Sequence, residues 1–139
     1  MIHVGDTMTS TGMYTDIILD YYRHPRNFGT LRKPDISARD SNPLCGDVID
    51  VQLQLKGGTV EKAVYSGHGC AISQAAAGML IEQVEGMALT DVKNLTKEDM
   101  LAALGISISP ARLKCALLAL KVLKMGVYAH LGAALSEDS

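Results

Sequence analysis

The sequence has few aromatic residues and no large excess of charge of either sign. Aromatic side chains make up 4% of its 139 residues, tryptophan is absent, and the formal net charge is -2 at pH 7. Proteins that bind single-stranded nucleic acid stack the bases on aromatic side chains, and a phosphate backbone is bound through a basic surface. The composition therefore argues against a nucleic-acid partner, whereas an apolar share of 47% is typical of a globular domain.

Long apolar runs are also missing. No uninterrupted apolar stretch approaches the roughly 18 residues of a membrane-spanning helix, and residues 1–12 lack the basic end and apolar segment of a secretory signal peptide. We therefore expect a cytoplasmic protein with no membrane partner. Because residues 1–12 show no hydrophobic period, we expect them to form a flexible N-terminal leader, and residues 13–139 to form a single domain.

Cysteine is scarce, and its count is odd. The three cysteines are Cys45, Cys70 and Cys115. In a cytoplasmic chain of this size, three cysteines are typical of free thiols or metal ligands and not of a disulfide framework. A cysteine taken alone most often packs as a small buried apolar residue, so a functional interpretation depends on all three together.

Alternating apolar residues predict strands in the first half of the chain. A short helix is predicted at 13–22, and it is followed by a weak edge strand at 36–40. Two further strands, 48–55 and 59–66, are joined by a two-residue hairpin turn at Gly57-Gly58. The sheet should have one apolar face and one mostly polar face.

Helices are predicted for the second half. The first covers 71–85, two short helices follow Thr90 and Thr96, and the last begins at Ser109-Pro110 and runs to Gly126. The predicted core stripe of the last helix consists of four leucines: Leu113, Leu117, Leu120 and Leu123.

The three cysteines share one property, since each is predicted near the end of a helix or strand. Cys45 and Asp47 stand two positions apart at the mouth of a strand, where side chains leave on the same face. Cys70 opens a helix, and Cys115 lies early in the last helix beside Lys114; helix N-termini and nearby cations both favour the thiolate form. Three thiolates and a carboxylate complete a tetrahedral set for zinc, or the outer ligands of a small iron–sulfur cluster.

Four segments, in the right order, resemble the iron–sulfur cluster assembly scaffold family that comprises IscU, SufU and the N-terminal domain of NifU. They are residues 14–29 (YTDIILDYYRHPRNFG), 42–47 (NPLCGD), 67–73 (GHGCAIS) and 110–116 (PARLKCA). The resemblance covers roughly residues 13–128. It implies an α+β fold of the SufE/NifU-like type, in which a small three-stranded antiparallel sheet packs against helices.

The resemblance further implies a scaffold and not an enzyme. Sulfur from a cysteine desulfurase and iron from an iron donor would be assembled into a 2Fe-2S cluster, which is then passed to apo iron–sulfur acceptor proteins. By position, Cys45, Asp47, Cys70 and Cys115 match the ligand set of the family. Cys115 and Cys70 are the candidate sulfur acceptors, Lys114 is given an auxiliary role, and homo-oligomerisation is left open.

Two features separate the branches of this family. Lys114 stands where the IscU branch has a histidine before its last cysteine, which leaves Asp47 as the expected fourth ligand. A lysine there is similar to the SufU branch, whose members bind zinc and accept sulfur, yet SufU proteins carry an extra segment between their second and third cysteines. The interval from Cys70 to Cys115 is too short for that segment.

We therefore favour the 2Fe-2S scaffold, in which zinc can occupy the cluster-free form. The alternative is a zinc-dependent sulfurtransferase of the SufU kind, and a third interpretation is a structural zinc domain. Thiolate ligands suit zinc and iron–sulfur clusters alike, so the ligand set does not separate these readings.

Overall fold

Three strands form one antiparallel sheet in the order β1-β2-β3. The computed structural model describes residues 16–43 and 46–138, with side chains described up to residue 132. The strands are β1 (Ile36–Asn42), β2 (Asp47–Lys56) and β3 (Thr59–His68). Ile49, Val51 and Leu53 alternate along β2 and are fully buried, and the turn at Gly57-Gly58 has positive φ at both residues, as expected for a two-residue hairpin.

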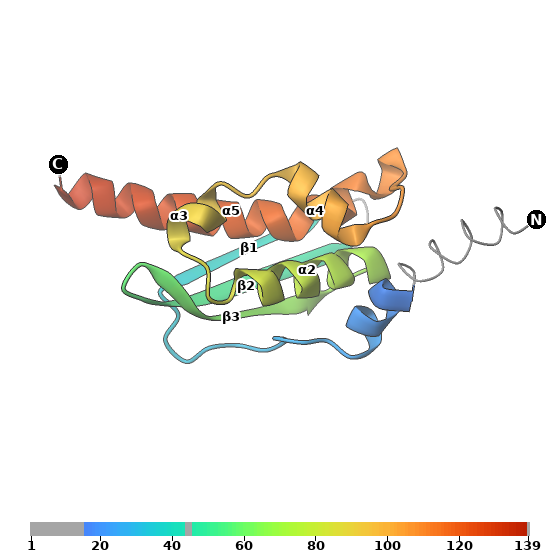
Figure 1. Ribbon diagram of the computed structural model, residues 1–139, viewed down its shortest axis with the longest axis horizontal. Coiled ribbons are helices and arrows are strands. Elements are labelled where there is room, and N and C mark those ends of the chain that lie inside the picture. Colours follow the sequence, from blue (N-terminus) through green and yellow to red (C-terminus); the bar gives the residue numbers. More distant parts are fainter. Residues whose placement is uncertain (1–15, 44–45, 139) are drawn as a thin grey trace, which may run out of the picture.

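Two long helices lie side by side on one face of this sheet (Figure 1). Helix α2 (Ala71–Val84) packs mainly on β3, and helix α5 (Pro110–Asp138) packs on β1 and β2. The alanines of α2 at positions 75–77 are fully buried, which allows close approach to the sheet and to α5. The predicted α+β architecture, a three-stranded antiparallel sheet against helices, is confirmed.

Short helices make the connections. Helices α3 (Leu89–Lys93) and α4 (Lys97–Leu104) link α2 to α5, and a helix at 16–23 contacts α2 through Tyr21, which lies beside Gly78 and donates a hydrogen bond to Glu82. At α4, Thr96 and Asp99 cap the helix reciprocally, and Gly105 ends it with a φ of 69°. The predicted start of this helix after Thr96 is therefore confirmed.

The segment that leads from the helix at 16–23 to β1 is tied to the edge of β3. Asn27 has a φ of 61°, and its carbonyl oxygen accepts a hydrogen bond from the Tyr65 backbone amide at 2.9 Å. The Phe28 ring meets the Tyr65 ring edge to face, with centroids 5.3 Å apart. Arg26 forms an ion pair with Asp20 at 2.8 Å. This connector is thus an ordered part of the fold.

Several boundaries differ from the sequence prediction. Strand β1 continues past residue 40 because Ser41 and Asn42 pair with the start of β2. Helix α5 does not end at Gly126, because this glycine lies inside the helix where the helix passes close to β1. There an added Cβ would stand 2.8 Å from Cγ2 of Ile36. The glycine allows close helix–sheet packing and does not stop the helix.

The predicted core stripe of α5 is partly wrong. Leu113 is 37% exposed, whereas Leu120 and Leu123 are buried as predicted. The buried face of the first turns instead includes Cys115 and Ala116, both fully buried. Leucines occur on both sides of this helix, so periodicity alone did not define which side faces the sheet.

Helix α5 also has the length and apolar composition of a membrane-spanning segment over Pro110–Gly132. Half of that stretch is buried inside the protein, against α2, β1 and β2. A core helix has these properties too. Arginine and lysine residues interrupt this stretch, so it contains no long uninterrupted apolar run.

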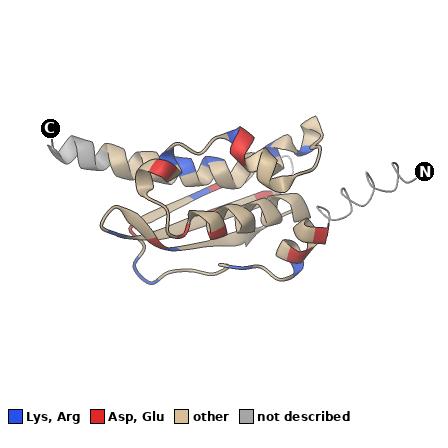
Figure 2. Cartoon of the chain, in the orientation of Figure 1, with Lys and Arg blue, Asp and Glu red and all other residues tan. Residues whose placement is uncertain are grey.

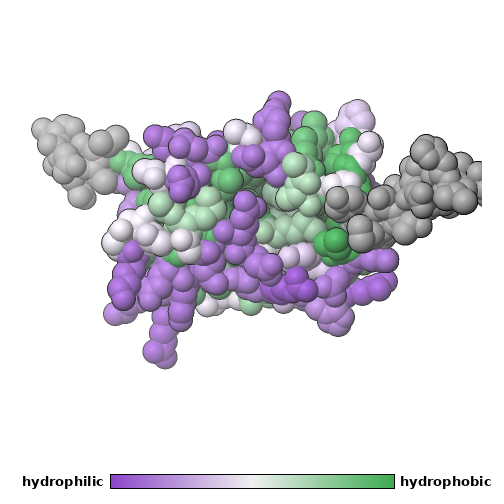
Figure 3. All heavy atoms as spheres, viewed as in Figure 1, coloured by the Kyte–Doolittle hydropathy of each residue, from purple (hydrophilic) through white to green (hydrophobic). Residues whose placement is uncertain are grey.

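The surface carries charges of both signs. Acidic and basic residues are interspersed over the face shown in Figure 2, and in Figure 3 the hydrophilic side chains gather along the lower edge while small apolar residues are visible over α2. Residues 1–12, which the sequence suggested as a leader, lie outside the described residues, and that assignment stays a prediction.

Candidate metal centre

Chain segments distant in sequence meet at one end of the sheet. Asn42 at the end of β1 pairs with Asp47 at the start of β2, and Val48 pairs with His68 at the end of β3. Helix α2 begins directly after β3, and α5 begins at the same end of the molecule (Figure 1). The structure thus assembles the residues that the sequence placed at separate element ends.

Three of the four predicted ligands lie together here. The ligand atoms of Asp47, Cys70 and Cys115 are all within 4.8 Å of one another. Asp47 and Cys115 are fully buried, and Cys70 is partly exposed. Zinc–sulfur bonds of about 2.3 Å in a tetrahedral site place neighbouring ligand atoms roughly 3–4 Å apart. Small side-chain movements would bring the three atoms around one ion.

Asp47 is oriented by the backbone of Cys70. Its Oδ1 accepts a hydrogen bond from the Cys70 backbone amide at 2.9 Å. Its Oδ2 is buried and has no hydrogen-bond partner among the described residues. A buried carboxylate oxygen without a partner is unfavourable, and a cation bound beside the two sulfur atoms would satisfy it. The donor set and this oxygen therefore fit a metal ion or a cluster iron.

Cys70 is the N-cap of α2, and its side chain is held by the first turn of the helix. Its Sγ accepts a hydrogen bond from the Ser73 backbone amide at 3.4 Å, and the Ser73 hydroxyl donates to the Cys70 carbonyl oxygen at 3.1 Å. Backbone N–H groups at a helix N-terminus stabilise negative charge on such a cap. The arrangement holds the sulfur of Cys70 beside the carboxylate of Asp47.

Gly69 leaves the space into which this carboxylate fits. An added Cβ at Gly69 would stand 2.2 Å from Oδ1 of Asp47 and 2.8 Å from Oγ of Ser73. Both Gly69 and Ser73 belong to the motif at 67–73, but the sequence alone assigned no role to either residue. The only signal was the sequence Gly67-His68-Gly69 before a helix start, which indicates close backbone approach without naming what approaches.

The remaining predicted residues are not part of this cluster as described. Cys45 lies outside the described residues, so its expected place beside the other ligands stays a prediction. Strand β2 begins at Asp47, and Gly46 before it has a φ of 70°, which is not a strand conformation. Lys114 lines a neighbouring pocket, and among the described residues no ion pair joins it to Asp47.

The sequence is similar to a known protein family and to proteins of that family. Residues 13–136 match the family described as NifU-like N terminal domain. The zinc-dependent sulfurtransferase SufU of Bacillus subtilis is 36% identical over 132 positions, which cover 83% of this chain and 89% of SufU. The iron–sulfur cluster assembly scaffold protein IscU 1 of Archaeoglobus fulgidus is 27% identical over 115 positions, which cover 83% of this chain and 74% of the relative.

The fold has solved counterparts. The crystal structure of FiSufU from Fervidobacterium islandicum AW-1 superposes with a TM-score of 0.67 at 24% identity, covering 80% of this chain and 93% of that chain. At this level of identity the likeness concerns the fold alone. The expected NifU-like fold is therefore confirmed.

Proposed function

Because the chain belongs to the NifU-like N-terminal domain family, we propose that it is a scaffold on which a 2Fe-2S cluster is assembled for delivery to other proteins. Sulfur would come from a cysteine desulfurase, iron from an iron donor, and the finished cluster would pass to apo acceptor proteins. The main support is the group formed by Asp47, Cys70 and Cys115, in which Oδ2 of Asp47 is buried and has no hydrogen-bond partner among the residues that the structure describes.

Each residue has a defined part in this proposal. Cys45, Cys70 and Cys115 supply thiolates to the cluster irons, and Asp47 supplies one oxygen. Since Oδ1 of Asp47 already accepts a hydrogen bond from the Cys70 amide, Oδ2 is the oxygen that the carboxylate offers first to iron. A carboxylate is a harder ligand than a thiolate and suits cluster iron less well. Asp47 is therefore the ligand that an incoming thiolate of an acceptor displaces.

Sulfur is received as a sulfane atom. The Cys70 thiolate attacks the terminal sulfur of the desulfurase persulfide, the sulfur–sulfur bond of the donor breaks, and the donor cysteine leaves as a thiolate. Cys70 then carries the persulfide, and no external oxidant is needed. Partial exposure of Cys70 and complete burial of Cys115 favour Cys70 for this first step.

A zinc-dependent sulfurtransferase is the second candidate function. It is favoured by the 36% identity to SufU and by Lys114, which matches the SufU branch. The interval from Cys70 to Cys115, which is too short for the extra segment of the SufU branch, favours the scaffold.

Anaerobic preparation followed by metal analysis and visible spectroscopy tests the two functions. With a cysteine desulfurase, cysteine and ferrous iron, a scaffold should gain visible charge-transfer bands and equal amounts of iron and acid-labile sulfide. A zinc sulfurtransferase should instead retain zinc and accumulate persulfide without visible bands. A protein that takes up neither iron with sulfide nor zinc would contradict both functions.

A further inference from the structure

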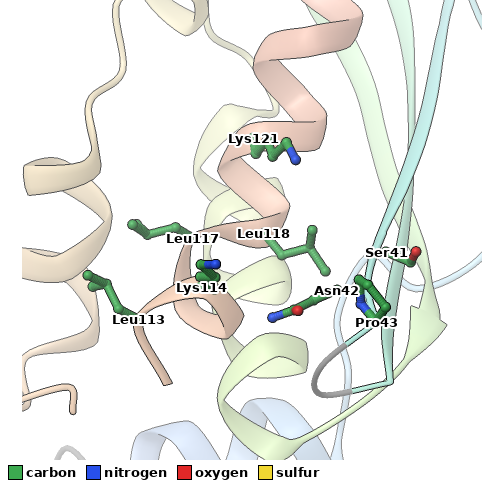
Figure 4. A pocket seen from close by; sticks show the side chains of 8 residues that line it. All are labelled: Ser41, Asn42, Pro43, Leu113, Lys114, Leu117, Leu118 and Lys121. Atoms are coloured by element: carbon green, nitrogen blue, oxygen red, sulfur yellow. The ribbon is translucent and has the colours of Figure 1, made fainter. Parts of the chain in front are cut away.

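A pocket of about 430 Å³ lies beside the candidate metal centre, between the end of β1 and the first turns of α5 (Figure 4). Pro43, Leu113 and Leu117 give it apolar walls, and the buried Asn42 points into it from β1. Lys114 lines the pocket although Cys115, the next residue, reaches the metal centre, because successive residues of a helix point about 100° apart. The pocket and the centre are therefore immediate neighbours.

The cationic groups of the pocket come from one helix face. Lys114 and Lys121 are seven residues apart, which places them two turns apart on the same side of α5. Among the described residues Lys114 has no ion pair or hydrogen bond, and Lys121 pairs with Asp40 at 2.8 Å while remaining 63% exposed. Asp40 offsets one of the two lysine charges, so the three groups together carry a net charge of +1 in a chain whose net charge is -2.

Apolar side chains extend this face along the helix. Six large apolar side chains of the described residues are exposed, and three of them, Leu113, Met125 and Tyr128, belong to α5. Tyr128 is seven residues beyond Lys121 and so continues the same row, with Met125 beside it. The face therefore combines lysines with apolar groups that nothing in the described structure covers.

We propose that this face of α5 is a docking surface for a partner-protein segment whose acidic side chains alternate with aliphatic ones along a helix. The partner's carboxylates would pair with Lys114 and Lys121, and its aliphatic side chains would cover Leu113, Leu117 and Tyr128. This proposal rests on the proposed function, since a scaffold has to hold its sulfur donor or cluster acceptor beside its ligands.

Charge and exposure favour this occupant over others. A second copy of the chain, docked symmetrically, would set lysines against lysines. A free small carboxylate would form ion pairs with lysines that are open to water. Each such exposed ion pair contributes at most about 1 kcal/mol to the binding free energy. A protein segment excludes water from Leu113 and the lysines together, which strengthens both the apolar and the ionic contacts.

A peptide probe tests the proposal on the full chain. The probe is a fluorescein-labelled helical peptide with glutamates seven positions apart and leucines three and four positions after each. Its fluorescence anisotropy is followed against protein concentration at low and at moderate salt. We expect binding that weakens as salt is added, and a matched peptide with glutamine in place of glutamate should bind about fivefold more weakly or worse.

Charge reversal locates the site. Lys121→Glu should weaken binding of the glutamate peptide about fivefold or more, whereas the same charge change at the exposed Lys62 on β3 should leave it nearly unchanged. Equal effects of the two variants, equal binding of both peptides, or no binding would overturn the proposal. Metal and sulfide content after reconstitution with ferrous iron and sulfide salts, without any partner protein, reports on the proposed function separately for wild type and Lys121→Glu, because Lys121 is not a ligand.

Discussion

Asp47 and Cys70 are joined across the candidate site by a 2.9 Å hydrogen bond from the Cys70 backbone amide to Oδ1 of Asp47. The bond links the start of β2 to the N-terminus of α2, and Oδ2 of Asp47 is buried without a hydrogen-bond partner in the described structure. The carboxylate is therefore oriented before any metal arrives, and Oδ2 is its unengaged oxygen. The predictions below test this arrangement and its surroundings.

Replacing Asp47 with cysteine should leave cluster assembly possible but slow the release of the cluster. A fourth thiolate makes the ligand shell the kind that holds resident clusters, so the bound cluster should be longer-lived. Transfer to an apo-ferredoxin is measured at equal cluster loading of the two proteins. Asp91→Cys, which adds a cysteine at an exposed position of α3, controls for the extra thiol. Transfer from Asp47→Cys as fast as from the wild type would show that the carboxylate is not the release point.

Gly69→Ala should displace the carboxylate of Asp47. The new Cβ would stand 2.2 Å from Oδ1 of Asp47, and the residue has a φ of 154°. We expect the metal-free protein to lose about 2–4 kcal/mol in free energy of unfolding and its zinc affinity to fall. Urea denaturation and competitive zinc titration measure the two effects.

Gly86→Ala is the matched control for this variant. Gly86 also has a positive φ, of 94°, but an added Cβ there meets nothing within 4 Å. Gly86→Ala should lower the free energy of unfolding by only about 1 kcal/mol and leave the zinc affinity unchanged. If both alanine variants behaved alike, backbone strain alone would account for the result and close approach of Asp47 would not matter.

Cys70 should carry the first transferred sulfur. Cys70 is a partly exposed residue, whereas Cys115 is fully buried and would have to move before it could attack a donor persulfide. After a brief reaction of the metal-free protein with a cysteine desulfurase and cysteine, peptide mapping by mass spectrometry should place the added mass on Cys70. Cys70→Ser should abolish the early product, whereas Cys115→Ser should retain it. Added sulfur on Cys45 alone would contradict this assignment.

Gly126→Ala should destabilise the fold far from the metal centre. The added Cβ would stand 2.8 Å from Cγ2 of Ile36 and 3.1 Å from Cβ of Ala38, so α5 would be pushed away from β1 at a cost of about 1–3 kcal/mol. Gly132→Ala, in the same helix but with open space around it, should raise stability by up to about 1 kcal/mol because alanine is the better helix former. Thermal unfolding distinguishes the two, and a stabilised Gly126→Ala would refute close packing here.

Features that depend on neighbouring residues were predictable from the sequence. The alternation along β2, the turn at Gly57-Gly58, the capping of α4 by Thr96 and the place of Cys70 at a helix start all follow from backbone preferences and short-range hydrogen bonds. The expectation that ligands at element ends would gather at one end of the domain was also accessible, because a small antiparallel sheet leaves few other arrangements.

Only the tertiary structure decided which face of α5 is buried and how the ligands are oriented. Leu113 and Cys115 are equally plausible core positions by periodicity, yet packing against β1 at Gly126 turns Cys115 inward and Leu113 outward. The bond between Asp47 and the Cys70 amide joins residues 23 positions apart, and the room at Gly69 exists only because those segments meet. Spacing along a chain defines local geometry, whereas the rotation of a helix and contacts between distant segments are set by the packing of the whole core.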